Sequence, residues 1–333
     1  MLAGRACALQ YAVRTVPVEL SFCVVNTEQR PLLRYCLDAI ARELATVDFA
    51  TEVLVLDNAS QDGSAEAARN HPVTTEVFAC RRRRGKAEND TELLKRARGR
   101  FCLLLNEDSE LEPGATVALH AALAADDSAG AAGAKLVNAD GEQLPSAWRF
   151  GSVGSVWLSA IGLYRRGVVQ SRGDRVRRVH WAHSAALMVR RSAAEGIGFL
   201  DPEFFAYVDE MDFCRRLRDA GWTTLYVPEA RAVRHAQPRT EDAVERRIVE
   251  AARNRDRYMR KHHSAPAALA VRWLSAWTFS WRAVRALGRP GADPAHHLRQ
   301  ARAALRPERG TGLAEEADEL NRRLAAGEPT GRR

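Results

Sequence analysis

Short apolar runs without polar alternation constrain the fold of this 333-residue chain more than any other feature. Three of them read SFCVVN (21–26), EVLVLD (52–57) and FCLLLN (101–106), and a segment with helical spacing of apolar residues follows each. A strand that is covered on both faces needs no polar alternation, and strand–helix–strand spacing suits right-handed crossovers. Residues 17–140 are therefore predicted to form a doubly wound, mostly parallel sheet flanked by helices, the α/β class.

The same patterns predict the other elements of the chain. Further strands are expected at 74–79, 131–137, 181–192, 222–228 and 230–235, and helices at 31–44, 89–98, 114–125 and 239–263. Residues 141–180 have a looser pattern. The predicted divisions are an N-terminal extension (1–16), a large domain (17–263, with halves 17–140 and 141–263), an amphipathic helical tail (264–306) and a flexible C-terminus (307–333).

Charge and cysteine usage limit the class of protein. The net charge of +8 suggests an anionic partner such as a nucleic acid, an acidic membrane or a phosphorylated substrate; the alternative is an arginine-rich composition without a basic face. Six scattered cysteines without a C-x-x-C pair predict free thiols in a reducing, cytoplasmic compartment. The N-terminus lacks an apolar signal region, and no run of ~18 uncharged apolar residues predicts a spanning helix.

Aromatic and basic residues alternate along the tail, in APAALAVRWLSAWTFSWRAVRALGR (265–289). Trp273, Trp277 and Trp281 recur at helical spacing beside several arginines, which is typical of a helix lying on an anionic membrane surface. Such a tail predicts a peripheral protein on the inner face of the plasma membrane. The alternative is a helix that packs against the preceding domain.

Polar clusters follow three of the predicted strands, namely Asn26–Thr27, Asp57–Asn58 and Asn106–Glu107–Asp108. Ligands of doubly wound sheets bind beyond the carboxyl ends of the strands, so these clusters are predicted to converge at one rim. Asp57 and Asn58 could bind a nucleobase or ribose, or could form an Asx-turn. Asp108 could hold a divalent cation, or could simply end a turn.

Basic and acidic residues elsewhere complete the set of candidates. Arg81–Arg84, Gly85 and Lys86 form a loop that could contact a diphosphate, or a solvated charge run in the case of Arg81 and Arg82. His235 could ligate a metal or touch a phosphate, although a lone histidine is more often structural. Asp209, Glu210 and Asp212, in FFAYVDEMDFCRRLRDAGW (204–222), could perform acid–base chemistry or cap a helix.

Taken together, these motifs resemble a family 2 glycosyltransferase of the GT-A fold. The resemblance is carried in order by SFCVVNTEQRPLL, EVLVLDNASQDGS, GKAEND, GRFCLLLNEDSEL, the segment 204–222 and VRH (233–235). It extends from about Glu19 to His263 and is greatest to the rhamnosyltransferase-like branch that builds bacterial polysaccharides.

The resemblance implies a nucleotide-diphosphate sugar as donor, and it assigns roles to the candidates. Asp57 and Asn58 fall where the family contacts the base and ribose, with Asn26 and Thr27 beside them and Asn106 within the metal motif. Asp108 falls on the acid that binds Mg²⁺ or Mn²⁺, and His235 on a histidine near the diphosphate. Glu210 falls on the general base, with Asp209 as the alternative, and His183, Ser184 and Asp212 on the acceptor side.

Some residues depart from the family pattern. Thr27–Glu28 replaces Tyr-Asn after the first strand, Asn106 replaces the first acid of the metal motif, and Asp209–Glu210 inverts the usual Glu-Asp pair. His183–Ser184 replaces a Ser-Gly-like element. The resemblance implies an inverting, hexosyltransferase-type enzyme that uses a glycan or lipid-linked acceptor, because a single displacement with a base on the opposite face inverts the anomeric centre.

Other classes of protein fit less well. A nicotinamide dehydrogenase or a sugar-phosphate nucleotidyltransferase needs a glycine-rich loop after the first strand, where this chain reads NTEQRP. No recognition motif supports nucleic-acid binding. A catalytically inactive scaffold of the same fold on a membrane surface remains an alternative, because fold does not imply function.

Overall fold

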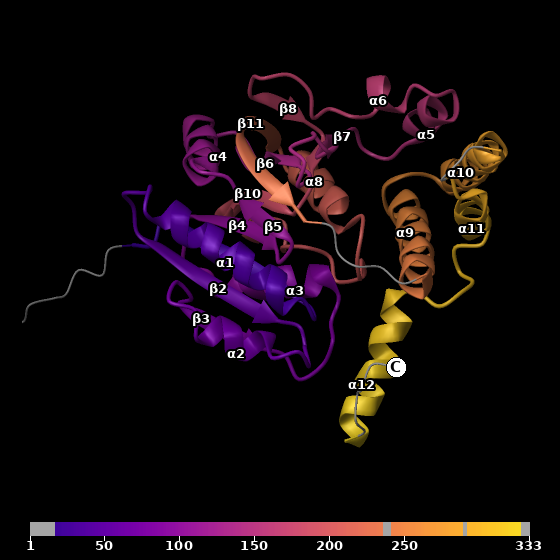
Figure 1. The fold of residues 1–333 in the computed structure, drawn as a ribbon. Helices are drawn as coiled ribbons and strands as arrows, with labels where there is room; N and C mark the ends of the chain where they lie inside the picture. The colour runs from indigo at the N-terminus through magenta and orange to yellow at the C-terminus, as the bar shows by residue number, and fades with distance from the viewer. Residues whose placement is uncertain (1–16, 236–240, 289–291, 328–333) are drawn as a thin grey trace, which may run out of the picture.

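The structure is a computed structural model that describes residues 17–235, 241–288 and 292–327. Its centre is a nine-stranded sheet with the order β3-β2-β1-β4-β10-β6-β11-β5, and β8 pairs with β11 beside this path (Figure 1). The predicted N-terminal extension, residues 1–16, lies outside the described residues.

The first half of the sheet is parallel, as the apolar runs predicted. β1 pairs on one side with β2 and on the other with β4, and β3 extends the sheet beyond β2. The strands are β1 (Leu20–Asn26), β2 (Thr51–Asp57), β3 (Glu76–Ala79) and β4 (Phe101–Asn106). The helices that connect them are α1 (Arg30–Leu44), α2 (Ser64–Arg69) and α3 (Lys86–Arg96).

The second half of the sheet is mixed. β10 (Ala186–Arg190) runs antiparallel between β4 and β6 (Ala129–Val137), while β11 (Thr223–Arg234) is parallel to β6. β5 (Ser109–Leu111) and β8 (Arg177–Val179) pair antiparallel with β11. The two strands predicted at 222–228 and 230–235 are one strand, whose register shifts between Val227 and Arg231 because Pro228 cannot donate to the ladder.

The remaining elements surround this sheet. A two-stranded ribbon pairs β7 (Ala147–Trp148) with β9 (Trp181–Ala182), within the region of looser pattern. The helices of this part are α4 (Ala115–Ala125), α5 (Val153–Ala160), α6 (Tyr164–Gly167), α7 (Arg191–Gly196) and α8 (Asp209–Asp219).

The hydrophobic core has two layers, one on each face of the sheet. Phe22 and Val24 of β1 pack in the layer that includes α1 and α4, whereas Cys23 and Val25 pack in the layer that includes α3, α7 and α8. Both sets of alternate residues are buried, so the strands carry no polar face. Among the described cysteines all are free, and only Cys80 is not fully buried.

Four helices follow the sheet: α9 (Glu241–His262), α10 (Ala265–Ala286), α11 (Pro294–Leu305) and α12 (Leu313–Ala326). α10 packs against α5, α9 and α11. The prediction of a flexible chain from residue 307 is wrong for α12. Its apolar residues Leu313, Ala317, Leu320 and Leu324 have helical spacing, and the Glu315 carboxylate accepts a hydrogen bond from the N–H of Gly312.

In the described part of the chain, no helix has both the length and the apolar character that crossing a bilayer requires.

Asp212 holds α8 against α9. Its buried carboxylate contacts the Nε of Arg216 at 2.8 Å, the Nζ of Lys261 at 2.7 Å and the Nε2 of His262 at 2.7 Å. Burial alone would raise the pKa of Asp212, but hydrogen bonds from His262, Lys261 and Arg216 outweigh it and lower the pKa to about 2. The sequence predicted an acceptor-side role for Asp212; these contacts support a role in helix packing instead.

We expect Asp212→Asn to lower the free energy of unfolding by about 1–3 kcal/mol at pH 7, because it removes the buried carboxylate that pairs with Arg216, Lys261 and His262. Thermal unfolding measures this, with Glu203→Gln as a control, since Glu203 is 71% exposed and 3.9 Å from its partner Arg257. A carboxylate whose pKa is lowered on folding stabilises above its unfolded pKa of about 4, so in the unsubstituted protein this contribution disappears as the pH falls from about 4 to 2. Equal melting temperatures for the two variants would contradict this role.

Candidate active site

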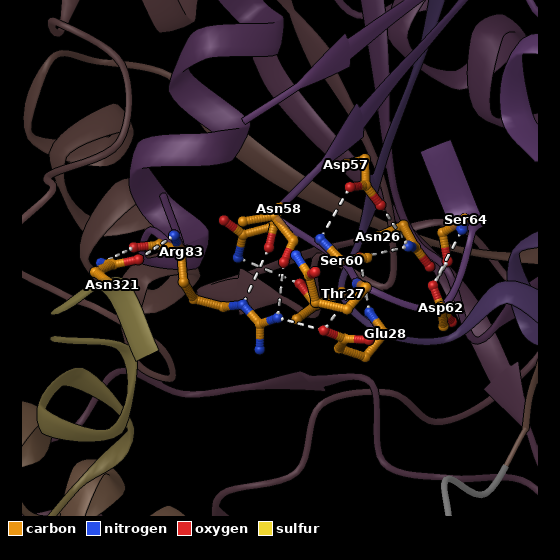
Figure 2. Close-up of polar contacts among 12 residues, drawn as sticks. Asn26, Thr27, Glu28, Asp57, Asn58, Ser60, Asp62, Ser64, Arg83 and Asn321 are labelled. Carbon is orange, nitrogen blue, oxygen red and sulfur yellow. Dashed lines mark hydrogen bonds and ion pairs between the residues drawn. The ribbon is translucent and has the colours of Figure 1, made fainter. Parts of the chain in front are cut away.

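Two polar residues at the carboxyl ends of β1 and β2 bind each other. The Nδ2 of Asn26 donates to the Oδ1 of Asp57 at 3.0 Å, and the N–H of Ser60 donates to the Oδ2 of Asp57 at 3.0 Å (Figure 2). Hydrogen bonds to both oxygens therefore fix the Asp57 carboxylate. The bond from Ser60 closes an Asx-type turn, which was the alternative predicted for this residue. Both roles are compatible, because the turn sets the direction of the carboxylate at the rim.

Asn58 joins β2 to the basic loop. Its Nδ2 donates to the carbonyl of Arg84 at 3.0 Å and to the Oγ1 of Thr27 at 3.3 Å, while its Oδ1 accepts from the N–H of Arg84 at 2.8 Å. The predicted donor residues Thr27, Asn58 and Arg84 therefore lie together (Figure 2 shows Thr27 and Asn58).

Gly85 is required where the basic loop meets the segment before α8. A Cβ on Gly85 would lie 2.7 Å from the carbonyl oxygen and 2.8 Å from the Cα of Phe205. The next N–H, of Lys86, donates to the same carbonyl at 2.6 Å. This close approach brings the loop beside Asp209 and Glu210, four and five residues further along the chain from Phe205.

The turn between β4 and β5 supplies two adjacent acids. Burial and the neighbouring Asp108 carboxylate raise the pKa of Glu107 to about 8, so a proton or a cation is favoured there. The Nε of Arg234 lies 3.3 Å from the Oδ2 of Asp108. His235 donates its backbone N–H to the carbonyl of Asp108 at 2.9 Å, while its imidazole Nε2 lies 2.9 Å from the Oε2 of Glu110.

These acids do not form a complete protein cage for a metal. Among the described residues no three histidine, cysteine, aspartate or glutamate side chains converge as a ligand set. A site for Mg²⁺ or Mn²⁺ at Asp108 would therefore take most of its oxygens from water and ligand phosphates, as such ions commonly do.

Strained backbone precedes the acid pair at the start of α8. Tyr207 and Val208 have φ values of 66° and 68°, in the left-handed region that a β-branched residue rarely adopts. Glu28 and Ala59, which follow the predicted donor residues Thr27 and Asn58, also have positive φ. Strain of this kind persists where the surrounding structure enforces it, and it is common at functional sites.

The two acids of α8 are buried together with a lysine. The exposed fractions of Asp209 and Glu210 are 1% and 7%. Burial, and then the Glu210 carboxylate, raise the pKa of Asp209 well above its usual range, while Lys86 opposes this. Burial alone would lower the pKa of Lys86, but Asp90 and Asp209 outweigh it and raise the pKa. Burial beside a second carboxylate therefore favours the neutral form of Asp209 more than that of an exposed aspartate, and Glu210 stays the predicted base with Asp209 as the alternative.

A chain of contacts connects Glu210 with Asp108. The Oε1 of Glu210 lies 3.8 Å from the Nδ1 of His183, and the Nε2 of His183 lies 3.0 Å from an Nη1 of Arg234, which contacts Asp108. Burial and the charges of Arg234 and Lys86 lower the pKa of His183 to about 3, so this imidazole is neutral at pH 7. Only two side chains therefore separate the predicted base from the predicted metal-binding acid.

Two predicted residues differ in how they reach this centre. Asn106 ends β4, immediately before Glu107 and Asp108, and its N–H donates to the carbonyl of Ala185 at 3.4 Å. Ser184 follows His183 but is fully buried, so any contact of its side chain with an acceptor requires the chain to move.

The sequence did not single out three residues of this region, although Arg83 belongs to the predicted basic loop. Arg234 contacts Asp108 and His183. It belongs to the VRH motif (233–235), of which only the histidine was predicted to be a site residue. Arg83 and Asn321 form the third side of the donor loop: the N–H of Arg83 donates to the Oδ1 of Asn321 at 2.6 Å, and the Nδ2 of Asn321 donates to the carbonyl of Arg83 at 2.9 Å (Figure 2).

The side chain of Arg83 also contacts residues at the rim of the sheet. Its Nε donates to the carbonyl of Asn58 at 3.0 Å, and an Nη2 lies 2.8 Å from the Oε1 of Glu28. The C-terminal helix α12 thus fixes the loop that holds the predicted donor residues. A separation of 238 residues hides this contact from any local sequence pattern.

Comparison with known proteins assigns the family. A family model described as glycosyltransferase-like family 2 matches residues 17–256. The chain therefore belongs to glycosyltransferase family 2, and the protein is a glycosyltransferase. It is 31% identical over 219 residues to N-acetylglucosaminyl-diphospho-decaprenol L-rhamnosyltransferase from two strains of Mycobacterium tuberculosis, which covers 59% of this chain and 71% of that protein. This relative agrees with the predicted rhamnosyltransferase-like branch.

Solved structures confirm the GT-A fold. A mannosyltransferase from Pyrobaculum calidifontis, in complex with GDP-Man and Mn²⁺, has a TM-score of 0.50 at 17% identity and covers 96% of this chain and 77% of its own. GalNAc-T7, with UDP, GalNAc and Mn²⁺, has a TM-score of 0.57 at 12% identity over 95% of this chain and 59% of its own. At these identities the likeness shows the fold alone.

We expect Asn321→Ala to loosen the donor loop without unfolding the sheet, because it removes both hydrogen bonds to the backbone of Arg83. Hydrogen exchange measures this as faster exchange of the amides of residues 81–86. The matched control is Arg322→Ala on the same helix, whose side chain is 75% exposed and, within the described residues, pairs with Glu319. If both variants exchange at the wild-type rate, α12 does not hold the loop.

Proposed function

We propose that this protein transfers a sugar from a nucleotide-diphosphate donor to a hydroxyl of a lipid-linked glycan, with inversion of the anomeric centre. One observation carries the proposal, namely the contact chain from Glu210 through His183 and Arg234 to Asp108. This chain of contacts supports a base at Glu210 and a cation ligand at Asp108, and the loop that holds Asn58 and Arg84 meets the segment before α8 at Gly85.

The donor is proposed to bind along the rim of the parallel strands. Asp57 and Asn58, with Asn26 and Thr27 behind them, would contact the base and ribose, as the family pattern implies. Arg84 and Lys86 would lie toward the diphosphate, because guanidinium and ammonium groups bind phosphate oxygens strongly. Asn106 would line the same edge at the end of β4.

Asp108 is the ligand that we propose for Mg²⁺ or Mn²⁺. Burial, and then the neighbouring Asp108 carboxylate, raise the pKa of Glu107, and a cation bound at this turn would favour the ionised form of both acids. A divalent cation bound here supplies Lewis acidity to the departing diphosphate. His235 would remain close through its backbone contact with Asp108, while its imidazole contacts Glu110.

Glu210 would remove the proton from the acceptor hydroxyl. The lowered pKa of His183 keeps its imidazole neutral, so no histidine cation 3.8 Å from the Glu210 carboxylate weakens it as a base. The lipid-linked acceptor is suggested by the mycobacterial relative, whose name specifies N-acetylglucosaminyl-diphospho-decaprenol. Such a reaction belongs to cell-wall or cell-surface polysaccharide assembly.

Peripheral binding to an anionic membrane is part of the proposal. One face of α10 packs on α5, α9 and α11, while the opposite face exposes Trp273, Trp277 and Trp281 by 62%, 66% and 50%. Trp157 and Ile161, in and just after the neighbouring α5, are also exposed (Figure 1 shows α5 near α10). Tryptophan and arginine at the edge of an apolar surface are typical of interfacial helices. Cytoplasmic localisation at the inner face of the plasma membrane follows from this proposal.

Glu210→Gln is expected to lower turnover by about 10²–10⁴-fold with donor binding retained, because the amide cannot accept the proton. Turnover is measured by nucleotide release in the presence of acceptor, and donor binding by calorimetry. Asp209→Asn serves as the comparison. Wild-type turnover in Glu210→Gln together with a large loss in Asp209→Asn would assign the base to Asp209.

Asp108→Ala is expected to abolish the increase in donor affinity that Mn²⁺ produces. Calorimetric titration of the nucleotide sugar with and without Mn²⁺ measures this, and Asp140→Ala, at an exposed turn, is the control. An unchanged Mn²⁺ effect in Asp108→Ala would remove Asp108 from the proposed metal site.

The triple variant Trp273→Ser/Trp277→Ser/Trp281→Ser is expected to lose sedimentation with anionic vesicles, because it removes the apolar contact area of α10. The control is Val117→Ser/Val176→Ser, at two exposed apolar residues outside this surface. Equal sedimentation of the triple variant and the wild-type protein would show that α10 is not the membrane contact.

A further inference from the structure

A pocket of about 460 Å³ lies beside α5, outside the proposed reaction centre. It is bounded by the segment after β7, the N-terminal turns of α5, the second half of α8 and the residue after α9. Its lining includes three arginines, a histidine and two apolar residues: Arg149, Arg215, Arg218, His180, Phe150 and Leu158. Its volume lies within the range of small-molecule sites.

Positive charge dominates this pocket. Asp219 pairs with the Nε of Arg215 at 3.0 Å and lies 3.6 Å from an Nη2 of Arg218, so one carboxylate serves two arginines. Arg149 has no acidic partner among the ion pairs of the described chain, and its side chain is exposed. Burial and the charges of Arg149, Arg218 and Arg215 lower the pKa of His180, consistent with uncompensated positive charge.

Several groups in the pocket are already oriented as donors. The Nδ1 of His180 accepts the N–H of Phe150 at 3.1 Å, so the neutral ring carries its proton on Nε2. The guanidinium of Arg218 lies 4.6 Å from the centre of the Phe150 ring, which restricts its motion. Guanidinium groups match the geometry of phosphate oxygens with paired hydrogen bonds.

One wall of the pocket is formed by α5, the helix that packs against α10. Leu158 lines the pocket, and its neighbour Trp157 is exposed. Residues 143–173 and 257–288, which include both helices, contain no aspartate or glutamate. A ligand with an anionic head and an apolar chain therefore fits this place better than a free anion.

The β7–β9 ribbon separates the pocket from the reaction centre. Trp148 stacks on Trp181 and lies near His183, whereas Arg149 and His180, at the alternate positions, line the pocket. A hydrogen bond from the N–H of Gly151 to the Sδ of Met211, at 3.3 Å, joins the pocket wall to the residue after Glu210. The pocket is therefore adjacent to the candidate base but not part of its contact chain.

We propose that this pocket binds the phosphate group of a lipid, whose chain lies along Leu158 and the exposed side chains of α5 and α10. The inference rests on the proposed membrane association. Two sources share this chemistry, namely the headgroup of an anionic phospholipid and the diphosphate of the lipid-linked acceptor.

The test uses the full-length protein and the variant Arg149→Ala/Arg218→Ala. Arg215 is left intact because it pairs with Asp219. In one arm, binding is measured to phosphatidylcholine vesicles with and without phosphatidylglycerol. In the other, KM is measured in detergent for N-acetylglucosaminyl-diphospho-lipid and for an N-acetylglucosamine glycoside without diphosphate.

Two further variants serve as controls. Arg69→Ala/Arg322→Ala removes the same charge from exposed sites on α2 and α12. It is expected to change vesicle binding and KM by less than about twofold, because α2 and α12 are not the helices proposed to contact the membrane. Arg149→Lys/Arg218→Lys keeps the charge but loses the paired hydrogen bonds, and is expected to give an intermediate effect. Unchanged melting temperatures confirm that all variants are folded.

The pocket variant is expected to lose affinity by about tenfold or more in one arm. Weaker binding to phosphatidylglycerol vesicles identifies the phospholipid headgroup, whereas a higher KM confined to the diphosphate acceptor identifies the acceptor lipid. Wild-type values in both arms, or losses equal to those of the Arg69/Arg322 control, would overturn the proposal. The vesicle arm needs no turnover, so it reports on the pocket even if wild-type protein transfers no sugar.

Discussion

Strands β1, β2 and β4 are buried on both faces, and this constraint determines where their polar residues can lie. Along these strands nearly every side chain packs in one of the two core layers. Polar groups that must meet a ligand therefore follow the last apolar residue of each strand, where Asn26, Asp57 and Asn106 end the strands. Because parallel strands end at one edge, the burial that stabilises the fold also assembles the candidate donor site.

The candidate reaction centre arises where the second half of the chain returns to that edge. β11 brings Arg234 to Asp108, the segment after β9 brings His183, and α8 brings Glu210. The surrounding structure holds strained backbone at Tyr207 and Val208, immediately before α8, and Gly85 makes a close contact with Phe205 of the same segment. Burial of Asp209 and Glu210 costs stability that packing elsewhere must offset, which is expected where chemistry requires a particular charge state.

The sequence predicted the parallel half of the sheet well, because doubly buried strands leave a pattern that local reasoning detects. It could not predict that 222–228 and 230–235 form one strand, since Pro228 indicates a break unless the register shift is known. It missed α12 because a polar, Gly-punctuated segment predicts flexibility, and the helix is stabilised by contacts with α9 and the distant Arg83. Contacts among Arg83, Asn321 and Glu28 depend on tertiary structure alone, and Asp212 could be assigned to helix packing only once α9 was placed beside α8.

The central claim is that Glu210 acts as a base on an acceptor hydroxyl in a single displacement at the centre defined by Glu210, His183, Arg234 and Asp108. The most direct measurement is the anomeric configuration of the transferred sugar, determined by NMR of the product and compared with that of the donor. A single displacement predicts inversion. A product that retains the configuration of the donor would contradict the account, because it requires a second displacement that this centre does not explain.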